Sequence, residues 1–258
     1  MTPSRPASAL PRPLDLTLPS NRFALLGAGA AVLAARTLGR PWGHALRAGA
    51  GAFCAWAIAR ELDPDHPGSA GAALTLALAS GVRQPPDVLG AFTLLSALRL
   101  TVCTVGERVT VADSVAVSAQ GALAGAFAPV GAALAPTLAL AGSAGARDAL
   151  SPPAWTAAAA LAGAALGRAA RRSPQPAGVL APALLGGVTL AAALLPPEQP
   201  ACRTDNEQHP VDGGRLRLTR AVAVTCATLD VASGGARRTA PLLAALLAVA
   251  ARRTASRS

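Results

Sequence analysis

The chain has 258 residues, of which 52% are hydrophobic and only 14% are charged. Soluble domains carry about 25% charged residues, so this composition argues against an ordinary soluble globular protein. Only 3% of the residues are aromatic, and most of the apolar residues are Ala and Leu. Small residues allow close helix packing in a bilayer, whereas soluble cores rely on larger side chains. We therefore expect a multi-pass membrane protein; an Ala-rich soluble helical protein from a GC-rich genome is the alternative.

A formal net charge of +10 is typical of proteins that bind nucleic acid. The basic residues are all arginines, however, and they are spread over many short gaps between apolar runs. Arginines at the ends of membrane helices account for this pattern, so we expect the lipid bilayer and no nucleic acid as partner. The four cysteines form no C-x-x-C pair, which indicates neither a zinc site nor a disulfide framework.

Residues 1–22 are rich in Pro and Arg and predict a flexible tail. Ten apolar segments follow, with two helices expected in the uncharged stretch 114–146. They are 23–35, 48–59, 68–82, 88–106, the two within 114–146, 153–167, 176–195, 221–232 and 239–251. We expect an all-α, polytopic transmembrane bundle of about 8–10 short, Ala/Leu/Gly-rich helices. This single domain covers 23–251, includes a polar loop at 198–220, and precedes a basic tail at 252–258.

Alternation of the helices predicts that the gaps after the second, fourth and eighth helices share one side of the bundle. These gaps contain Glu61–His66, Glu107–Asp113 and Asp205–Asp212. The arginine clusters at 36–47 and 168–172 fall on the other side. Lys and Arg alone set membrane orientation, and their numbers on the two sides nearly balance, so orientation stays open. The expected location is the cell membrane, of the bacterial cytoplasmic type.

The turn at 60–70 concentrates acidic and imidazole side chains between two apolar runs. Asp63 and Asp65 have D-x-D spacing, and Mg²⁺ often binds one or two carboxylates together with substrate phosphates. Histidine has an unperturbed pKa near neutrality, so His66 is also a candidate acid or base. The alternative is a plain helix-to-helix turn in which Asp65 or Ser69 caps the next helix.

Arg99 lies inside the fourth apolar run. An ionised side chain in such a run is costly and marks a functional or structural pairing. The available partners are Glu61, Asp87, Glu107 and Asp113. One hypothesis is that Arg99 clamps an anionic headgroup or phosphate through two hydrogen bonds. The other is an internal ion pair that fastens the fourth helix; Asp113 is also interpreted as the N-cap of the fifth.

Two further patterns concern loops and helix packing. Asp205, Glu207, His209 and Asp212 place carboxylates around a histidine, which suits either a second ligand site or an ordinary polar loop. Gly121-x-x-x-Gly125 and Gly163-x-x-x-Gly167 match the small-x-x-x-small pattern of closely packed helices. In a glycine-rich chain this pattern supports close packing and nothing more.

Two functions are consistent with these observations. The first is a transporter-like or structural bundle without a cofactor, in which polar pairs surround Arg99 and the turn at 60–70. The second is a membrane-embedded enzyme that acts on a phosphate-bearing lipid or isoprenoid, with Mg²⁺ at Asp63 and Asp65. In either case an anionic lipid or small molecule is the expected ligand; the substrate and the oligomeric state are left open. The candidate site residues are Glu61, Asp63, Asp65, His66, Arg99 and Asp113.

Overall fold

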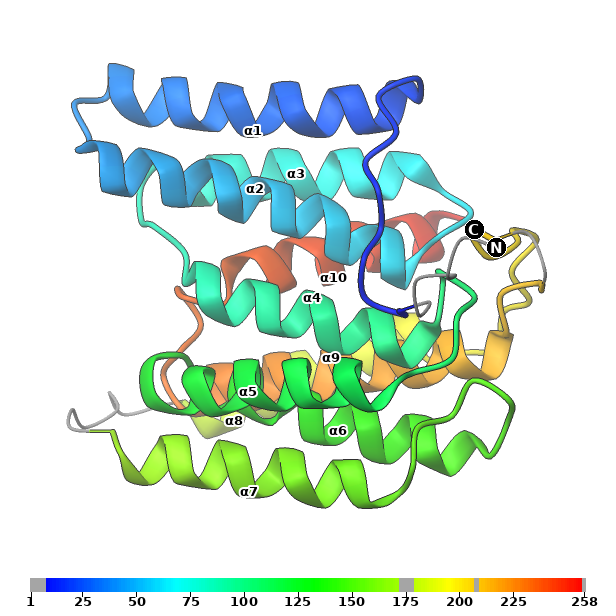
Figure 1. Ribbon diagram of the computed structural model, residues 1–258. Coiled ribbons are helices and arrows are strands. Elements are labelled where there is room, and N and C mark those ends of the chain that lie inside the picture. Colours follow the sequence, from blue (N-terminus) through cyan, green and yellow to red (C-terminus); the bar gives the residue numbers. More distant parts are fainter. Residues whose placement is uncertain (1–7, 172–178, 207–208, 257–258) are drawn as a thin grey trace, which may run out of the picture.

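The structure of the protein, a computed structural model, describes residues 8–171, 179–206 and 209–256. Within these ranges the chain forms ten α-helices and no sheet, which confirms the all-α prediction (Figure 1). The bounds are α1 Pro19–Thr37, α2 Trp42–Leu62, α3 Pro67–Gly81, α4 Val88–Val102, α5 Val111–Phe127, α6 Val130–Ala146, α7 Trp155–Ala169, α8 Leu180–Leu194, α9 Gly213–Ala232 and α10 Ala240–Ala255.

Local sequence accounts for where the helices begin. Proline stands in the first turn of α1, α3 and α10, where its missing N–H has no intrahelical partner to lose. Thr110 caps α5 and forms a capping box with Asp113, so Asp113 is the third helical residue and the prediction that it is the N-cap was wrong. The predicted caps of α3 were also wrong, because His66 holds that position without a side-chain cap bond. Ser69 donates its hydroxyl to Asp63 instead.

The helices lie side by side with alternating direction, so every second loop falls at the same end of the bundle (Figure 1). At this end Asp65 accepts hydrogen bonds from the backbone of Ala201 and Cys202, and the Asp205 N–H donates to Thr104 O. The loops after α2, α4 and α8 therefore meet, as their place in the chain predicted. We call this end of the molecule the polar end.

The centre of the bundle consists of α2, α4 and α9, which have the largest numbers of buried residues. Alanine dominates the main core cluster, with leucines such as Leu94, Leu98 and Leu246 filling the larger spaces. Small side chains bring the helix backbones close together, which the composition had indicated.

Both Gly-x-x-x-Gly patterns lie at helix contacts. A Cβ on Gly125 of α5 would stand 2.7 Å from Ala164 O of α7, which is too close for any side chain. Gly167 of α7 meets the α5 backbone at Ala122 O even more closely, while Gly121 packs on Pro136 of α6. The predicted close packing is confirmed.

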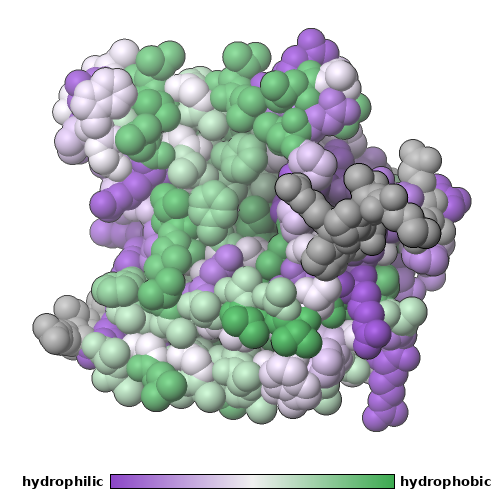
Figure 2. Space-filling model, viewed as in Figure 1, coloured by the Kyte–Doolittle hydropathy of each residue, from purple (hydrophilic) through white to green (hydrophobic). Residues whose placement is uncertain are grey.

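Large apolar side chains also cover much of the outside of the bundle. Figure 2 shows them across the face that carries α1, α2 and α4, with hydrophilic residues gathered toward the helix ends. On α8 only Ala183 and Leu194 are buried, although this helix contains no charged residue. Fifteen exposed large apolar side chains lie on four helices: Phe23, Leu25, Leu26 and Leu33 on α1, Val111, Val115, Leu123 and Phe127 on α5, Trp155, Leu161 and Leu166 on α7, and Leu180, Leu184, Leu185 and Val188 on α8.

Among the described residues, no helix has both the length and the apolar character that crossing a membrane requires.

The start of α9 is held by a buried arginine. Arg215 donates to both carboxylate oxygens of Asp148 at 2.7 Å and also reaches Thr101 O at 2.9 Å and Ser143 Oγ at 3.0 Å. One side chain thus connects α9 with the ends of α4 and α6. The hydrogen bonds from Arg215 lower the pKa of Asp148 to about 2.

We expect the Asp148–Arg215 pair to make stability depend on acid pH. The folded pKa lies below the ordinary value of 3.8. The stabilisation is therefore complete above that value and is lost as the pH falls toward about 2. Thermal unfolding from about pH 5 to about pH 2 should show a smaller fall in melting temperature for Asp148→Asn than for the wild type. Parallel curves for the two proteins would contradict the pairing.

A second prediction concerns the α5–α7 contact. Gly125→Ala should lower the free energy of unfolding by about 1–3 kcal/mol, because the new methyl group forces the two backbones apart. Gly186→Ala on α8 is the matched control, since a Cβ there meets nothing within 4 Å. The control should unfold at the same or a higher temperature than the wild type. The contact is not as close as described if both variants unfold alike.

Candidate functional site

A cavity of about 820 Å³ opens at the polar end, bounded by the N-terminal segment (residues 8–18), α2, α4 and the loop after α8. Its lining is divided into two parts. Six charged side chains line the first part: Arg12, Arg60, Glu61, Arg99, Arg203 and Asp205. Six large apolar side chains line the second: Leu14, Leu18, Phe53, Trp56, Phe92 and Leu95. This combination of a charged part and an apolar part is what an amphiphilic ligand requires.

The residues on one face of α2 and one face of α4 explain why the cavity has a charged part and an apolar part. On α2, Phe53, Trp56 and Arg60 follow one another at spacings of three and four residues and therefore lie on one face. On α4, Phe92 and Arg99 are seven residues, or two turns, apart. Each helix thus presents aromatic side chains along the cavity and an arginine at its polar end.

Glu61 is the centre of the charged part, and it is fully buried. Its Oε1 accepts from Arg99 Nε at 2.9 Å and from Arg12 Nη1 at 3.4 Å. Its Oε2 accepts from Thr104 Oγ1 at 2.5 Å. A buried carboxylate is tolerated only when it is paired and hydrogen-bonded, and both oxygens meet that condition here. Of the four partners considered for Arg99, the structure selects Glu61.

The N-terminal segment closes one side of the cavity and crosses the polar ends of α2 and α4 (Figure 1). Arg99 Nη1 donates to Leu10 O at 2.8 Å, and Arg12 Nη2 donates to Asp205 Oδ1 at 2.7 Å. Asp113 accepts from Ser8 Oγ and from the Ala9 N–H. Asp113 therefore holds this segment in place and does not pair with Arg99.

Arg60 differs from the other charged groups of the cavity. Among the described residues its guanidinium has no hydrogen bond and no ion pair, although it lines the cavity close to Glu61 and Asp205. Arg12 and Arg99 are both held by buried contacts. Arg60 is therefore a cation that is open to a ligand.

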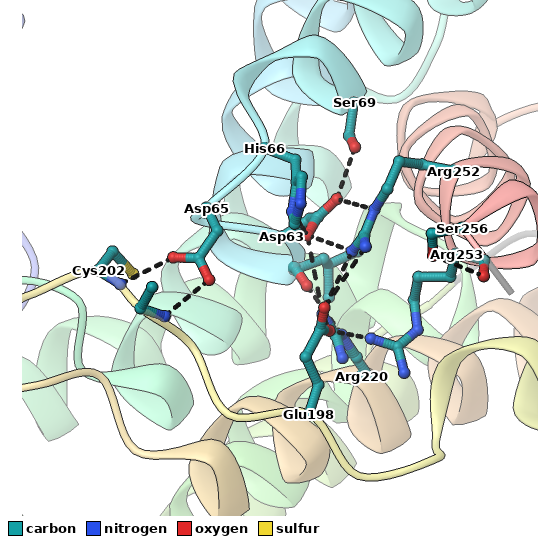
Figure 3. A network of polar contacts seen from close by, with 12 residues as sticks. Asp63, Asp65, His66, Ser69, Glu198, Cys202, Arg220, Arg252, Arg253 and Ser256 are labelled. Carbon is teal, nitrogen blue, oxygen red and sulfur yellow. Dashed lines mark hydrogen bonds and ion pairs between the residues drawn. The ribbon is translucent and has the colours of Figure 1, made fainter.

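Asp63 does not line the cavity and belongs to a second polar cluster, which Figure 3 shows. It is buried and receives two hydrogen bonds from Arg252 of α10, at 2.6 and 3.0 Å. Ser69 Oγ donates to it at 2.6 Å, and His66 Nδ1 lies 3.0 Å from its Oδ1. Asp63 thus fastens the turn between α2 and α3 to α10.

Glu198, in the loop after α8, completes this cluster. Arg253 donates to it, and Arg220 Nη2 lies 2.7 Å from its Oε2. Arg220 is buried as well, and its Nε donates to Leu62 O at 2.8 Å. Two carboxylates and three arginines therefore lie together, which gives the cluster a net positive charge when His66 is neutral.

The two carboxylates of the D-x-D pattern take different partners. The Asp65 carboxylate binds the backbone of Ala201 and Cys202 (Figure 3). Burial alone would raise the pKa of Asp65, but these hydrogen bonds outweigh it and place the pKa below its ordinary value. A Mg²⁺ ion bound between Asp63 and Asp65 stays a prediction. The different partners of the two carboxylates do not support it.

Asp63, His66 and Glu198 do lie close enough to share an ion, since one ligand atom of each falls within 4.8 Å of the others. Arg252, which is bound to both oxygens of Asp63, would first have to move. Repulsion between a divalent cation and three guanidinium groups opposes binding further. The cluster is better suited to holding helices together than to holding a metal.

Of the six predicted site residues, the structure thus brings only Glu61 and Arg99 together at the cavity, and places Asp63 and His66 in the second cluster. The residues that the sequence reasoning missed are Arg12, Arg60 and Arg203 at the cavity. For Arg60 a signal was present: Phe53, Trp56 and Arg60 share one helical face at the end of an apolar run. No comparable signal exists for Arg12, because it lies in an irregular segment.

Comparison with known proteins gave no match to a family model, to a curated protein or to a solved structure.

We expect Glu61→Gln to destabilise the fold far more than Asp205→Asn. Both substitutions remove one carboxylate from Arg12, but only the first leaves the largely buried Arg99 without a counter-charge. Loss of one partner from a buried ion pair costs about 3–5 kcal/mol. An exposed pair contributes about 1 kcal/mol or less, and Asp205 retains 35% of its side-chain exposure. Thermal or denaturant unfolding measures the difference, and equal losses would contradict the central role of Glu61.

Proposed function

We propose that this chain is a multi-pass integral membrane protein of the cell membrane, a transporter-like helical bundle that binds a ligand in the cavity between the N-terminal segment, α2 and α4. The observation that carries the proposal is the charge-lined and apolar-lined cavity, which lies beside an apolar outer surface.

The outer surface favours a lipid environment. Helix α8 has no charged side chain and lies on the outside, with Leu184, Leu185 and Val188 exposed. Its one hydroxyl, Thr189 Oγ1, donates to Leu185 O within the helix and needs no water. Moving a large apolar side chain out of water contributes about 1.5–3 kcal/mol. Lipid around α1, α5, α7 and α8 would remove the many exposed apolar groups from water.

Helix length sets a condition on this proposal. A 15-residue helix such as α8 is about 22 Å long, whereas the hydrocarbon core of a bilayer is about 30 Å thick. Since no described helix meets the requirement for crossing alone, the helices would have to enter the bilayer as one packed group. Local thinning of the bilayer and arginines that extend toward the interface then accommodate the difference.

The cavity is placed to receive a ligand from that surface. Its lining residues Leu18 and Phe92 are 49% and 42% exposed, so the apolar part of the cavity continues onto the apolar outer face. Its charged part lies at the polar end, where the helices meet the loops. A ligand that enters from the lipid would therefore meet the arginines with its polar group. This favours binding of a lipid-borne molecule over a purely structural role.

Two measurements test the proposal. The expressed protein should stay in the membrane pellet after alkaline carbonate extraction and require detergent for release. Mass spectrometry of the purified protein should then detect a co-purifying small molecule. Ala57→Trp, which fills the cavity from α2, should reduce that ligand severalfold. Ala79→Trp on the far part of α3 is the control for an added indole and should retain it. Release by carbonate, or equal ligand content in both variants, overturns the proposal.

A further inference from the structure

We infer that the ligand of the cavity is an anionic amphiphile, a hydrocarbon chain with one phosphate or carboxylate head, and that Arg60 binds the head. This inference rests on the proposed function and names its ligand class. It depends on the charge balance in the cavity, on the free guanidinium of Arg60, and on the apolar wall.

The charge balance favours an anion. The charged part of the cavity contains four arginines and two carboxylates, Glu61 and Asp205. A third carboxylate, Asp15, also lines the cavity, but it accepts hydrogen bonds from its neighbour Thr17. The carboxylates of Glu61 and Asp205 bind Arg12 and Arg99, and none of the three carboxylates forms a hydrogen bond with Arg60. A ligand with a single anionic head would pair with Arg60, whereas a cationic head would be repelled by it.

Arg60 is the residue positioned to bind such a head. The guanidiniums of Arg12 and Arg99 are held by Glu61, and the guanidinium of Arg60 has no hydrogen-bond or ion-pair partner among the described residues. A guanidinium presents a planar set of donors that matches phosphate and carboxylate oxygens and forms two hydrogen bonds with either. The partly buried position on α2 shields this interaction from water, which strengthens it.

The apolar wall accounts for the chain of the amphiphile. Phe53 and Trp56 stand next to each other, with ring centroids 5.7 Å apart, directly before Arg60 on the same helix face. Leu95 and Phe92 continue the wall on α4 toward the apolar outside. The volume of about 820 Å³ lies within the range of about 300–1,000 Å³ typical of small-molecule sites. Inorganic phosphate alone would leave most of this volume unfilled.

Calorimetric titration of the detergent-solubilised protein with three probes tests the inference. The probes are monododecyl phosphate, dodecyl glucoside with a neutral head, and inorganic phosphate without a chain. Monododecyl phosphate should bind at least about tenfold more tightly than either of the others, a difference of about 1.4 kcal/mol. Equal affinity of the first two would overturn the role of the anionic head, and equal affinity of the first and third would overturn the role of the chain.

Substitutions of single arginines test which residue binds the anionic head of the ligand. Arg60→Gln should weaken monododecyl phosphate binding about tenfold and leave dodecyl glucoside unchanged. Arg83→Gln is the matched control, because Arg83 is exposed in the turn before α4 and does not line the cavity. Unchanged affinity in Arg60→Gln overturns the assignment to Arg60. If that variant does not fold, Arg60→Lys, which keeps the charge and loses the planar donors, takes its place, with a severalfold weaker affinity expected.

These outcomes are separate from failure of the proposed function. If no probe binds and no molecule co-purifies, the cavity is not a ligand site and both proposals fall. If dodecyl glucoside binds as well as the phosphate, or Arg60→Gln has no effect, the ligand-binding bundle stands and only its anionic amphiphile is rejected.

Discussion

The structure depends on the neutralisation of one carboxylate that has no contact with solvent. Glu61 lies in the last turn of α2 inside the bundle, and its charge is tolerated because guanidiniums from two directions and a hydroxyl surround it. Those donors come from the N-terminal segment, from α4 and from the loop after α4. The requirement to satisfy one side chain therefore fixes the relative position of three parts of the chain. The cavity is the space that remains beside them.

Glu61 and Asp63, two residues apart, divide the polar end between them. Glu61 turns toward α4 and the cavity, whereas Asp63 turns toward α10 and the loop after α8. The Asp63 cluster has every carboxylate oxygen engaged by arginine, hydroxyl or imidazole groups, so it binds helices to one another. The Glu61 group leaves Arg60 beside it without a partner. One short turn thus supplies both a structural anchor and the edge of a binding site.

The sequence was sufficient to predict the order of the helices, since long apolar runs are separated by proline, arginine and acidic gaps. It did not fix their ends: the predicted polar loop 198–220 includes the start of α9, which begins at Gly213 and not at 221. It also identified Arg99 as unusual, because a charge within an apolar run must be paired. It did not identify the partner, since four carboxylates were compatible and only tertiary packing selects Glu61. The D-x-D spacing was misleading for a related reason: the turn sends Asp63 and Asp65 to different neighbours, which spacing alone does not reveal. Arg12 had no periodic pattern to mark it.

The closing of the cavity by the loop after α8 has a consequence for the order of assembly. Residues near 12, 61, 99 and 205 all contribute to the charged part, so the chain must be synthesised almost to α9 before they can meet. Until then Asp205 is absent, and Arg12 has only one of its two carboxylates. A nascent chain that ends before this loop lacks the part of the cavity wall that Arg203, Thr204 and Asp205 supply. Maturation of the site is therefore among the last events of folding.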